Sequence, residues 1–144
     1  MPSVGRACFP ILLLSLLIQI PAAASAAQAS RQTINQVSQL IVNSYDLLNR
    51  SDAEGARREC AKALALEEKY SDPFIAATVH VCFGDVDDHE SKTASACQHY
   101  NQALRKLQAT PKQHPAQRVL PTQINVVEGK IFALSCAAGS ADKK

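Results

Sequence analysis

The chain has 144 residues, with 15 basic and 13 acidic side chains and a formal net charge of +2 at pH 7. This small charge, together with four Phe, three Tyr and no Trp, argues against a nucleic-acid-binding groove or a polybasic membrane-binding surface. The length suits a single domain with a modest core.

The first 26 residues are predicted to be a secretory signal peptide. A start that carries Arg6 precedes an apolar run over residues 11–20, and small residues with an Ala-x-Ala cleavage site near Ala26 follow it. The run is far shorter than the roughly 20 residues that span a bilayer, which argues against a membrane anchor. We therefore expect a periplasmic or secreted protein with no membrane insertion after cleavage. A flexible segment over residues 27–33 is expected to lead into the folded domain.

Helical periodicity begins at Ile34, where apolar residues recur on one face for about 15 residues. Ser51 and Glu54 have the spacing of a capping box, which predicts the start of a second helix that continues to about Tyr70. The two helices are expected to form an antiparallel hairpin.

A second hairpin is predicted from Asp72 onward. Asp72 is suited to cap a third helix with Pro73 at its first position, and this helix is expected to end at Gly84 or Val86. The polar residues that follow, in which Asp87 or Asp88 serves as the next cap, predict a turn. A fourth helix should then end near Ala109.

The segment after Thr110 contains three prolines and is predicted to be irregular. The last clear periodicity runs from Ile124 to Leu134 and predicts a fifth helix ending around Ala137. Residues 139–144 read as a disordered polar tail.

Small and aromatic residues recur at matching places in the two hairpins. The second hairpin has Phe83-Gly84 on its first helix and Ala96, Tyr100 and Ala103 on its second, and the first hairpin has Ala56, Cys60 and Ala63. This pattern resembles the tetratricopeptide repeat. The resemblance implies an all-α, right-handed array of helix-turn-helix hairpins over residues 34–138, with about two repeats and a C-terminal capping helix.

The sequence departs from that pattern at several positions. Ser44 stands where a glycine would lie, Asp87 where a tyrosine would lie, and Ala63 and Ala103 are 40 residues apart instead of the usual 34. A generic helix bundle is the alternative.

Four cysteines follow the signal peptide: Cys60, Cys82, Cys97 and Cys136. An even number in an exported chain predicts two disulfides. Helical angles favour Cys60 with Cys82 and Cys97 with Cys136, which would join each hairpin to the next element. The rival pairing is Cys82 with Cys97 and Cys60 with Cys136.

No catalytic, metal or cofactor motif is evident. His80, Cys82, Cys97 and His99 suggest zinc, but residues two apart on a helix point about 200° apart, so neither pair can hold one ion. We expect no enzyme activity, no metal and no cofactor.

We expect a protein or peptide partner. The resemblance implies that the first helix of each hairpin contacts it, which makes Asn43, Asp46, Thr78 and His80 candidate partner-binding residues. The expected role is that of a scaffold or accessory factor in the cell envelope or a secretion system. A disulfide-braced bundle that inhibits an extracellular enzyme is the alternative, and self-association to complete the short stack is also open. Aromatic residues that could line a peptide groove are Tyr45, Tyr70, Phe74 and Tyr100.

Overall fold

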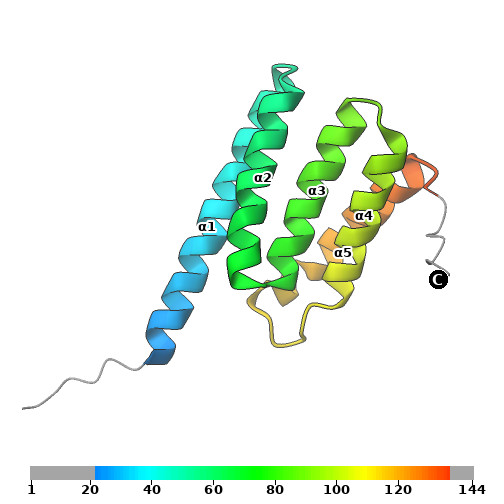
Figure 1. Cartoon of the computed structure of the whole chain (residues 1–144). Coiled ribbons are helices and arrows are strands. Elements are labelled where there is room, and N and C mark those ends of the chain that lie inside the picture. The colour runs from blue at the N-terminus through cyan, green and yellow to red at the C-terminus, as the bar shows by residue number, and fades with distance from the viewer. Residues whose placement is uncertain (1–21, 137–144) are drawn as a thin grey trace, which may run out of the picture.

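The computed structural model describes residues 22–136 and consists of helices joined by short turns (Figure 1). No strand occurs among these residues, so the all-α fold class is confirmed. The long helices pack as two antiparallel hairpins, with a last helix packed against the second hairpin. The elements are α1 (Ala22–Asn49), α2 (Ala53–Tyr70), α3 (Pro73–His89), α4 (Thr93–Gln108), the 3-10 helix η1 (Pro115–Arg118) and α5 (Leu120–Ala133).

The helices lie in two layers. Figure 1 shows α2, α3 and α4 side by side, with α1 behind α2 and α5 behind α4. Helix α1 also packs against α3. Helices α1 and α5 therefore lie on the same side of α3, and this side of the molecule is formed by α1, α5 and the face of α3 between them.

Two aspartates set where α2 and α3 begin. Asp72 accepts hydrogen bonds from the backbone N–H groups of Phe74 and Ile75, and Pro73 occupies the first turn of α3, as predicted. The predicted Ser51 capping box of α2 is wrong. Asp52 caps that helix instead, because Ser51 takes a left-handed conformation with φ of 62° and ends the preceding turn.

The turn between α3 and α4 comes later than predicted. Asp87 and Asp88 do not cap α4 but lie inside α3, which continues to His89, and α4 starts after Lys92. The physical reason is that Asp87 is buried and hydrogen-bonded to Arg57 of α2, a partner 30 residues away in the chain. A polar residue with such a partner does not need to lie in a turn.

The two ends of the helical region also differ from expectation. Residues 27–33, predicted to be a flexible lead-in, are helical and belong to α1, since nothing in this Ala- and Gln-containing stretch breaks a helix. Helix α5 begins at Leu120, earlier than predicted, and Pro121 lies in its first turn, where its missing N–H costs nothing. Residues 1–21 of the predicted signal peptide and the predicted tail lie outside the described residues.

Small residues let the paired helices approach each other. Alanines are buried in both hairpins, and a Cβ placed on Gly84 would lie 2.5 Å from the ring of Tyr100. The residues on which the repeat resemblance depends are thus buried inside the two hairpins. These fully buried positions are Ala56, Cys60, Ala63, Ala96, Tyr100 and Ala103.

Two disulfides join neighbouring elements. Cys60 of α2 is bonded to Cys82 of α3, and Cys97 of α4 is bonded to Cys136, just after α5. This is the pairing that the helical angles favour. Ser44, which stands at the glycine position of the resemblance, places its hydroxyl 3.4 Å and 3.3 Å from the two sulfurs of the first bridge.

Candidate functional site

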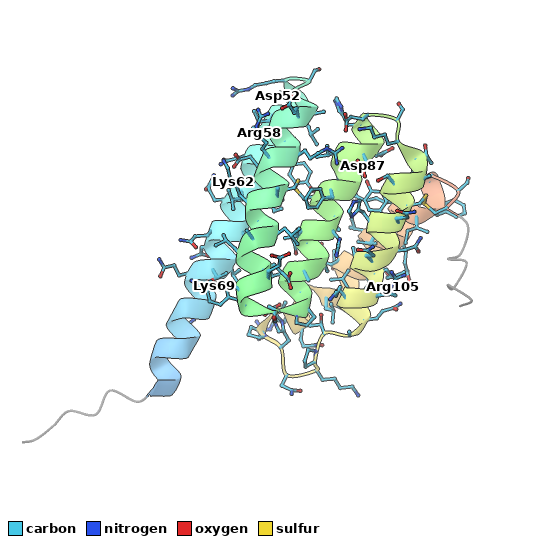
Figure 2. All side chains as sticks on the ribbon, in the orientation of Figure 1. Asp52, Arg58, Lys62, Lys69, Asp87 and Arg105 are labelled. Atoms are coloured by element: carbon cyan, nitrogen blue, oxygen red, sulfur yellow. A yellow bond between two sulfur atoms is a disulfide. The ribbon has the colours of Figure 1, made fainter. Side chains whose placement is uncertain are left out.

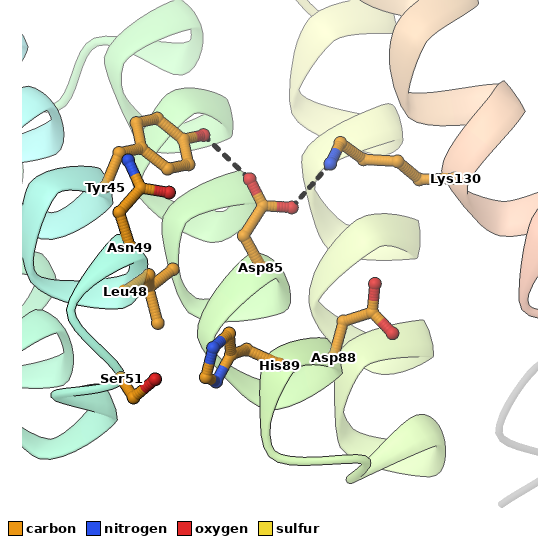
Figure 3. Close-up of a pocket in the computed structure, with 8 residues that line it drawn as sticks. All are labelled: Tyr45, Leu48, Asn49, Ser51, Asp85, Asp88, His89 and Lys130. Carbon is orange, nitrogen blue, oxygen red and sulfur yellow. Dashed lines mark hydrogen bonds and ion pairs between the residues drawn. The ribbon is translucent and has the colours of Figure 1, made fainter.

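Four helices bring polar side chains together around Asp85 of α3. The hydroxyl of Tyr45 from α1 donates to its carboxylate at 2.7 Å, and the hydroxyl of Tyr100 from α4 donates at 2.6 Å. The amine of Lys130 from α5 completes the group at 2.6 Å (Figure 3). We call these four residues the Asp85 cluster. It fixes α1, α3 and α5 to one another on the side of the molecule that they share.

The cluster depends on the close contact between α3 and α4. Because Gly84 has no side chain, the ring of Tyr100 lies directly against α3, and its hydroxyl reaches the carboxylate one residue further along. Lys130 lies over the same ring, with 5.4 Å from its amine to the ring centroid, a cation–π contact.

The phenols act as hydrogen-bond donors only. Burial raises the pKa of Tyr45 far above its usual range, and the negative charge of Asp85 and the hydrogen bond to it raise the pKa further. Burial and the same carboxylate raise the pKa of Tyr100 in the same way. With two phenols and an ammonium as donors, the carboxylate of Asp85 has most of its acceptor capacity filled. This arrangement is suited to holding helices together and not to accepting a proton from a substrate.

An open cleft of about 560 Å³ adjoins the cluster. It lies where α1 and α3 end, and the side chain of Leu48 from α1 is largely buried at its edge (Figure 3). Asp88 and His89 are exposed there, whereas Asp85 is largely buried. The lining residues are Tyr45, Leu48, Asn49, Ser51, Asp85, Asp88, His89 and Lys130.

Apolar side chains flank this cleft on the same faces of α1 and α5. Val42 lies three residues before Tyr45 and is 52% exposed, and Val126 lies four residues before Lys130 and is 45% exposed. At these spacings, side chains share one face of a helix. The side formed by α1, α3 and α5 therefore combines exposed apolar groups with a polar cleft, a mixture typical of protein-binding surfaces.

A second polar cluster lies on the opposite side of α3, where Asp87 faces α2 and α4 (Figure 2). Its carboxylate, 1% exposed, accepts hydrogen bonds from Arg57 at 2.6 Å and from the hydroxyl of Ser95. His99 lies 3.7 Å away through Nε2, and Glu90 also binds Arg57. We call these five residues the Asp87 cluster.

Ser95, His99 and Asp87 have the residue types of a hydrolase triad but not its geometry. The hydroxyl of Ser95 donates to Asp87, so His99 is not positioned to take its proton. Burial would raise the pKa of Asp87, but hydrogen bonds from Ser95 and Arg57 outweigh burial and hold the pKa below its usual range. The group reads as a buried, charge-paired link between α2, α3 and α4.

His80 and His99 meet beside that cluster. Their Nδ1 atoms are 3.3 Å apart, and the ring of His99 stacks on Phe83 with 5.3 Å between centroids. Burial lowers the pKa of both imidazoles. The nearby His99, Lys106 and Arg105 lower the pKa of His80 further. Among the described residues, no group of three or more His, Cys, Asp or Glu side chains is placed to hold a metal ion.

The structure does not bring the four predicted partner-binding residues together. Asn43 is half-buried and accepts a hydrogen bond from Gln39, and Asp46 is exposed on α1. Thr78 donates to a backbone carbonyl in its own helix, two turns before Asp85 on the same side of α3. His80 points away from that side, toward α4.

The four aromatic residues that could line a peptide groove also lie in different places. Tyr45 lines the cleft, whereas Tyr100 is fully buried. Phe74 packs against His114, and Tyr70 is exposed at the end of α2.

The sequence analysis named neither Lys130 nor Asp85 as a site residue. No local signal marks either residue, because their partners come from other helices. The one available hint was Gly84 before Asp85, since the close approach that it permits also brings Tyr100 within reach.

No family model matches this chain, and comparisons with curated proteins and with solved structures found no match either.

Proposed function

We propose that this protein binds a peptide segment of another protein along the side formed by α1, α3 and α5. The observation that carries the proposal is the Asp85 cluster, which holds these three helices in a fixed arrangement beside an open cleft. A surface that is set in advance loses less free energy on binding than one that must first become ordered. Exposed Val42 and Val126, together with the partly exposed ring of Tyr45, supply apolar contact area next to it.

The repeat resemblance supports the same surface. Tetratricopeptide-like arrays bind peptides on the face formed by the first helix of each hairpin, and here these helices are α1 and α3, with α5 in the corresponding third place. The role that follows is a scaffold or accessory factor. We found no feature of the described residues that favours the enzyme-inhibitor alternative.

Export to the periplasm or the extracellular space is part of the proposal. It is supported by the predicted signal peptide and by two disulfides, which persist in oxidising compartments. No helix in the described part of the chain is long and apolar enough to cross a membrane.

Site-specific photocrosslinking in intact cells tests the binding surface. A photoreactive amino acid at Val42 or Val126 should form a crosslink to a defined protein, because both side chains are exposed on the proposed face. The matched control is Glu68, which is exposed on α2. Crosslinks of equal yield from Glu68, or none from either valine, would contradict the proposal.

Cell fractionation and N-terminal sequencing test export. We expect the protein in the periplasmic or extracellular fraction, with a mature N-terminus near residue 27. Full-length protein in the cytoplasm with reduced cysteines would contradict it.

A further inference from the structure

We infer that the cleft beside the Asp85 cluster receives a lysine or arginine side chain of the bound peptide. The inference rests on the proposed function, since it concerns the partner of the same surface. It adds which chemical group the partner presents and where that group lies.

The two carboxylates of the cleft differ in their partners. Asp85 is neutralised by Lys130 and accepts two phenol hydrogen bonds. Asp88, one turn further along α3, is exposed in the same cleft (Figure 3), and among the described residues no cation is paired with it. The charge of Asp88 is therefore available to an incoming cation, whereas that of Asp85 is not.

Two helices end at the cleft. Helix α1 ends at Asn49 and α3 ends at His89, and both of these residues line the cleft. The carbonyl end of a helix carries a partial negative charge and stabilises a cation by about 0.3–1 kcal/mol. Two such ends at the mouth of one cleft add to the negative charge of Asp88, and Lys130, the cation in the same lining, is already paired with Asp85.

The size and surroundings of the cleft also suit a side chain. Its volume of about 560 Å³ exceeds the size of an ion with its water shell, so there is room for a whole side chain to lie in this open cleft. On α1, the exposed side chain of Val42 and the partly exposed ring of Tyr45 extend the surface beyond Asp88. Lysine and arginine side chains have an apolar stem and a charged end, which match the apolar groups and the acidic group along this surface.

The test uses the full mature chain with both disulfides formed, and a phage library of random dodecapeptides as the probe. Peptides selected on the protein should share a lysine or arginine, and fluorescence anisotropy then measures the affinity of one synthetic peptide. Asp88→Asn should weaken binding about fivefold, because one partly exposed charge pair is lost. The exposed control Glu68→Gln should not change the affinity.

A charge swap sharpens the test. A peptide in which the shared basic residue is replaced by glutamate should bind poorly to the natural protein and regain affinity with Asp88→Lys. Raising the salt concentration from 50 to 300 mM should weaken the natural complex more than the Asp88→Asn complex. Circular dichroism should show that each variant remains folded, as expected for an exposed position.

The outcomes separate the inference from the proposed function. If Val42→Gln weakens binding but Asp88→Asn does not, the surface binds peptides and the cation inference is wrong. If the selected peptides share no basic residue, the inference is also wrong. If neither substitution matters, or if no peptide is enriched, both the inference and the proposed function are contradicted.

Discussion

Asp85 and Asp87 are two residues apart on α3, and helix geometry turns them to opposite sides of the molecule. Asp87 faces α2 and α4, where Arg57 and Ser95 enclose it completely. Asp85 faces α1 and α5, where Tyr45 and Lys130 bind its carboxylate oxygens but leave an open cleft alongside. The Asp87 cluster thus fills the contact between α2, α3 and α4, whereas the Asp85 cluster lies beneath an accessible surface.

The residue type of a buried carboxylate therefore says little about its role. Both aspartates join three or more helices, and both have a Lys or Arg partner. The difference lies in what surrounds them, namely a filled contact between helices in one case and accessible apolar and acidic groups in the other. Substitutions on the two sides should therefore differ in what they change.

The largest expected effects on stability come from the two disulfides, which join α2 to α3 and α4 to the end of α5. Removing a bridge by paired Cys→Ser substitution should lower the free energy of unfolding by about 3–4 kcal/mol for loops of this size. Cys60–Cys82 is fully buried, whereas Cys97 and Cys136 are partly exposed. Mild reductant should therefore open Cys97–Cys136 first, which mass spectrometry of alkylated protein would measure. Faster opening of the buried bridge would contradict this order of accessibility.

Gly84→Ala should destabilise the protein by about 2–3 kcal/mol. The new Cβ would lie 2.5 Å from the ring of Tyr100, so α3 and α4 must separate and the Asp85 cluster must rearrange. Chemical denaturation measures the effect. The matched control is Gly129→Ala in α5, where a Cβ meets nothing within 4 Å, and it should stabilise by about 0.5–1 kcal/mol. Equal effects at the two glycines would show that the close contact is absent.

Asp87→Asn should cost about 2 kcal/mol, because a charge-assisted hydrogen bond to Arg57 is lost in a buried place. Asp85→Asn should cost less, about 1 kcal/mol, since Lys130 can turn toward water in the cleft. Denaturation at pH 7 tests this order. The pKa of Asp87 is lowered in the folded protein, so its contribution is present above the ordinary aspartate pKa of about 3.9. It should be lost as the pH falls below that value, and the difference between the natural protein and Asp87→Asn should then shrink.

Much of this fold is predictable from local signals. Apolar periodicity located the helices, Asp72 and Pro73 marked the start of α3, and the small residues marked the helix contacts. The turn after α3 was misplaced because consecutive acidic residues usually lie in solvent. Burial of Asp87 depends on Arg57, which lies in another helix, and no local rule supplies that partner.

The candidate site was less predictable for the same reason. Tyr45 was recognised as an aromatic that could line a groove, but the residues that complete its surroundings come from α3, α4 and α5. Thr78 and His80 are predicted to bind the partner because both lie on the first helix of the second hairpin, although a spacing of two places them on opposite sides of that helix. A site assembled from four helices requires their packing to be known first.

The smallest expected effect concerns His80 and His99, which pack on the Asp87 side of α3 with Arg57 from α2 and Arg105 and Lys106 from α4 nearby. Their pKa values are lowered in the folded protein, so the unfolded chain, with an ordinary histidine pKa of about 6.5, takes up protons first as the pH falls. The contribution of these two histidines to stability should therefore be fully present above pH 6.5 and decline below it. Replacing both residues by glutamine should flatten this decline in thermal unfolding followed from pH 7.5 to 5, while binding on the opposite side of α3 stays unchanged. An unchanged slope in the double variant would show that the decline arises elsewhere, and a loss of peptide binding would show that the two sides of α3 are coupled.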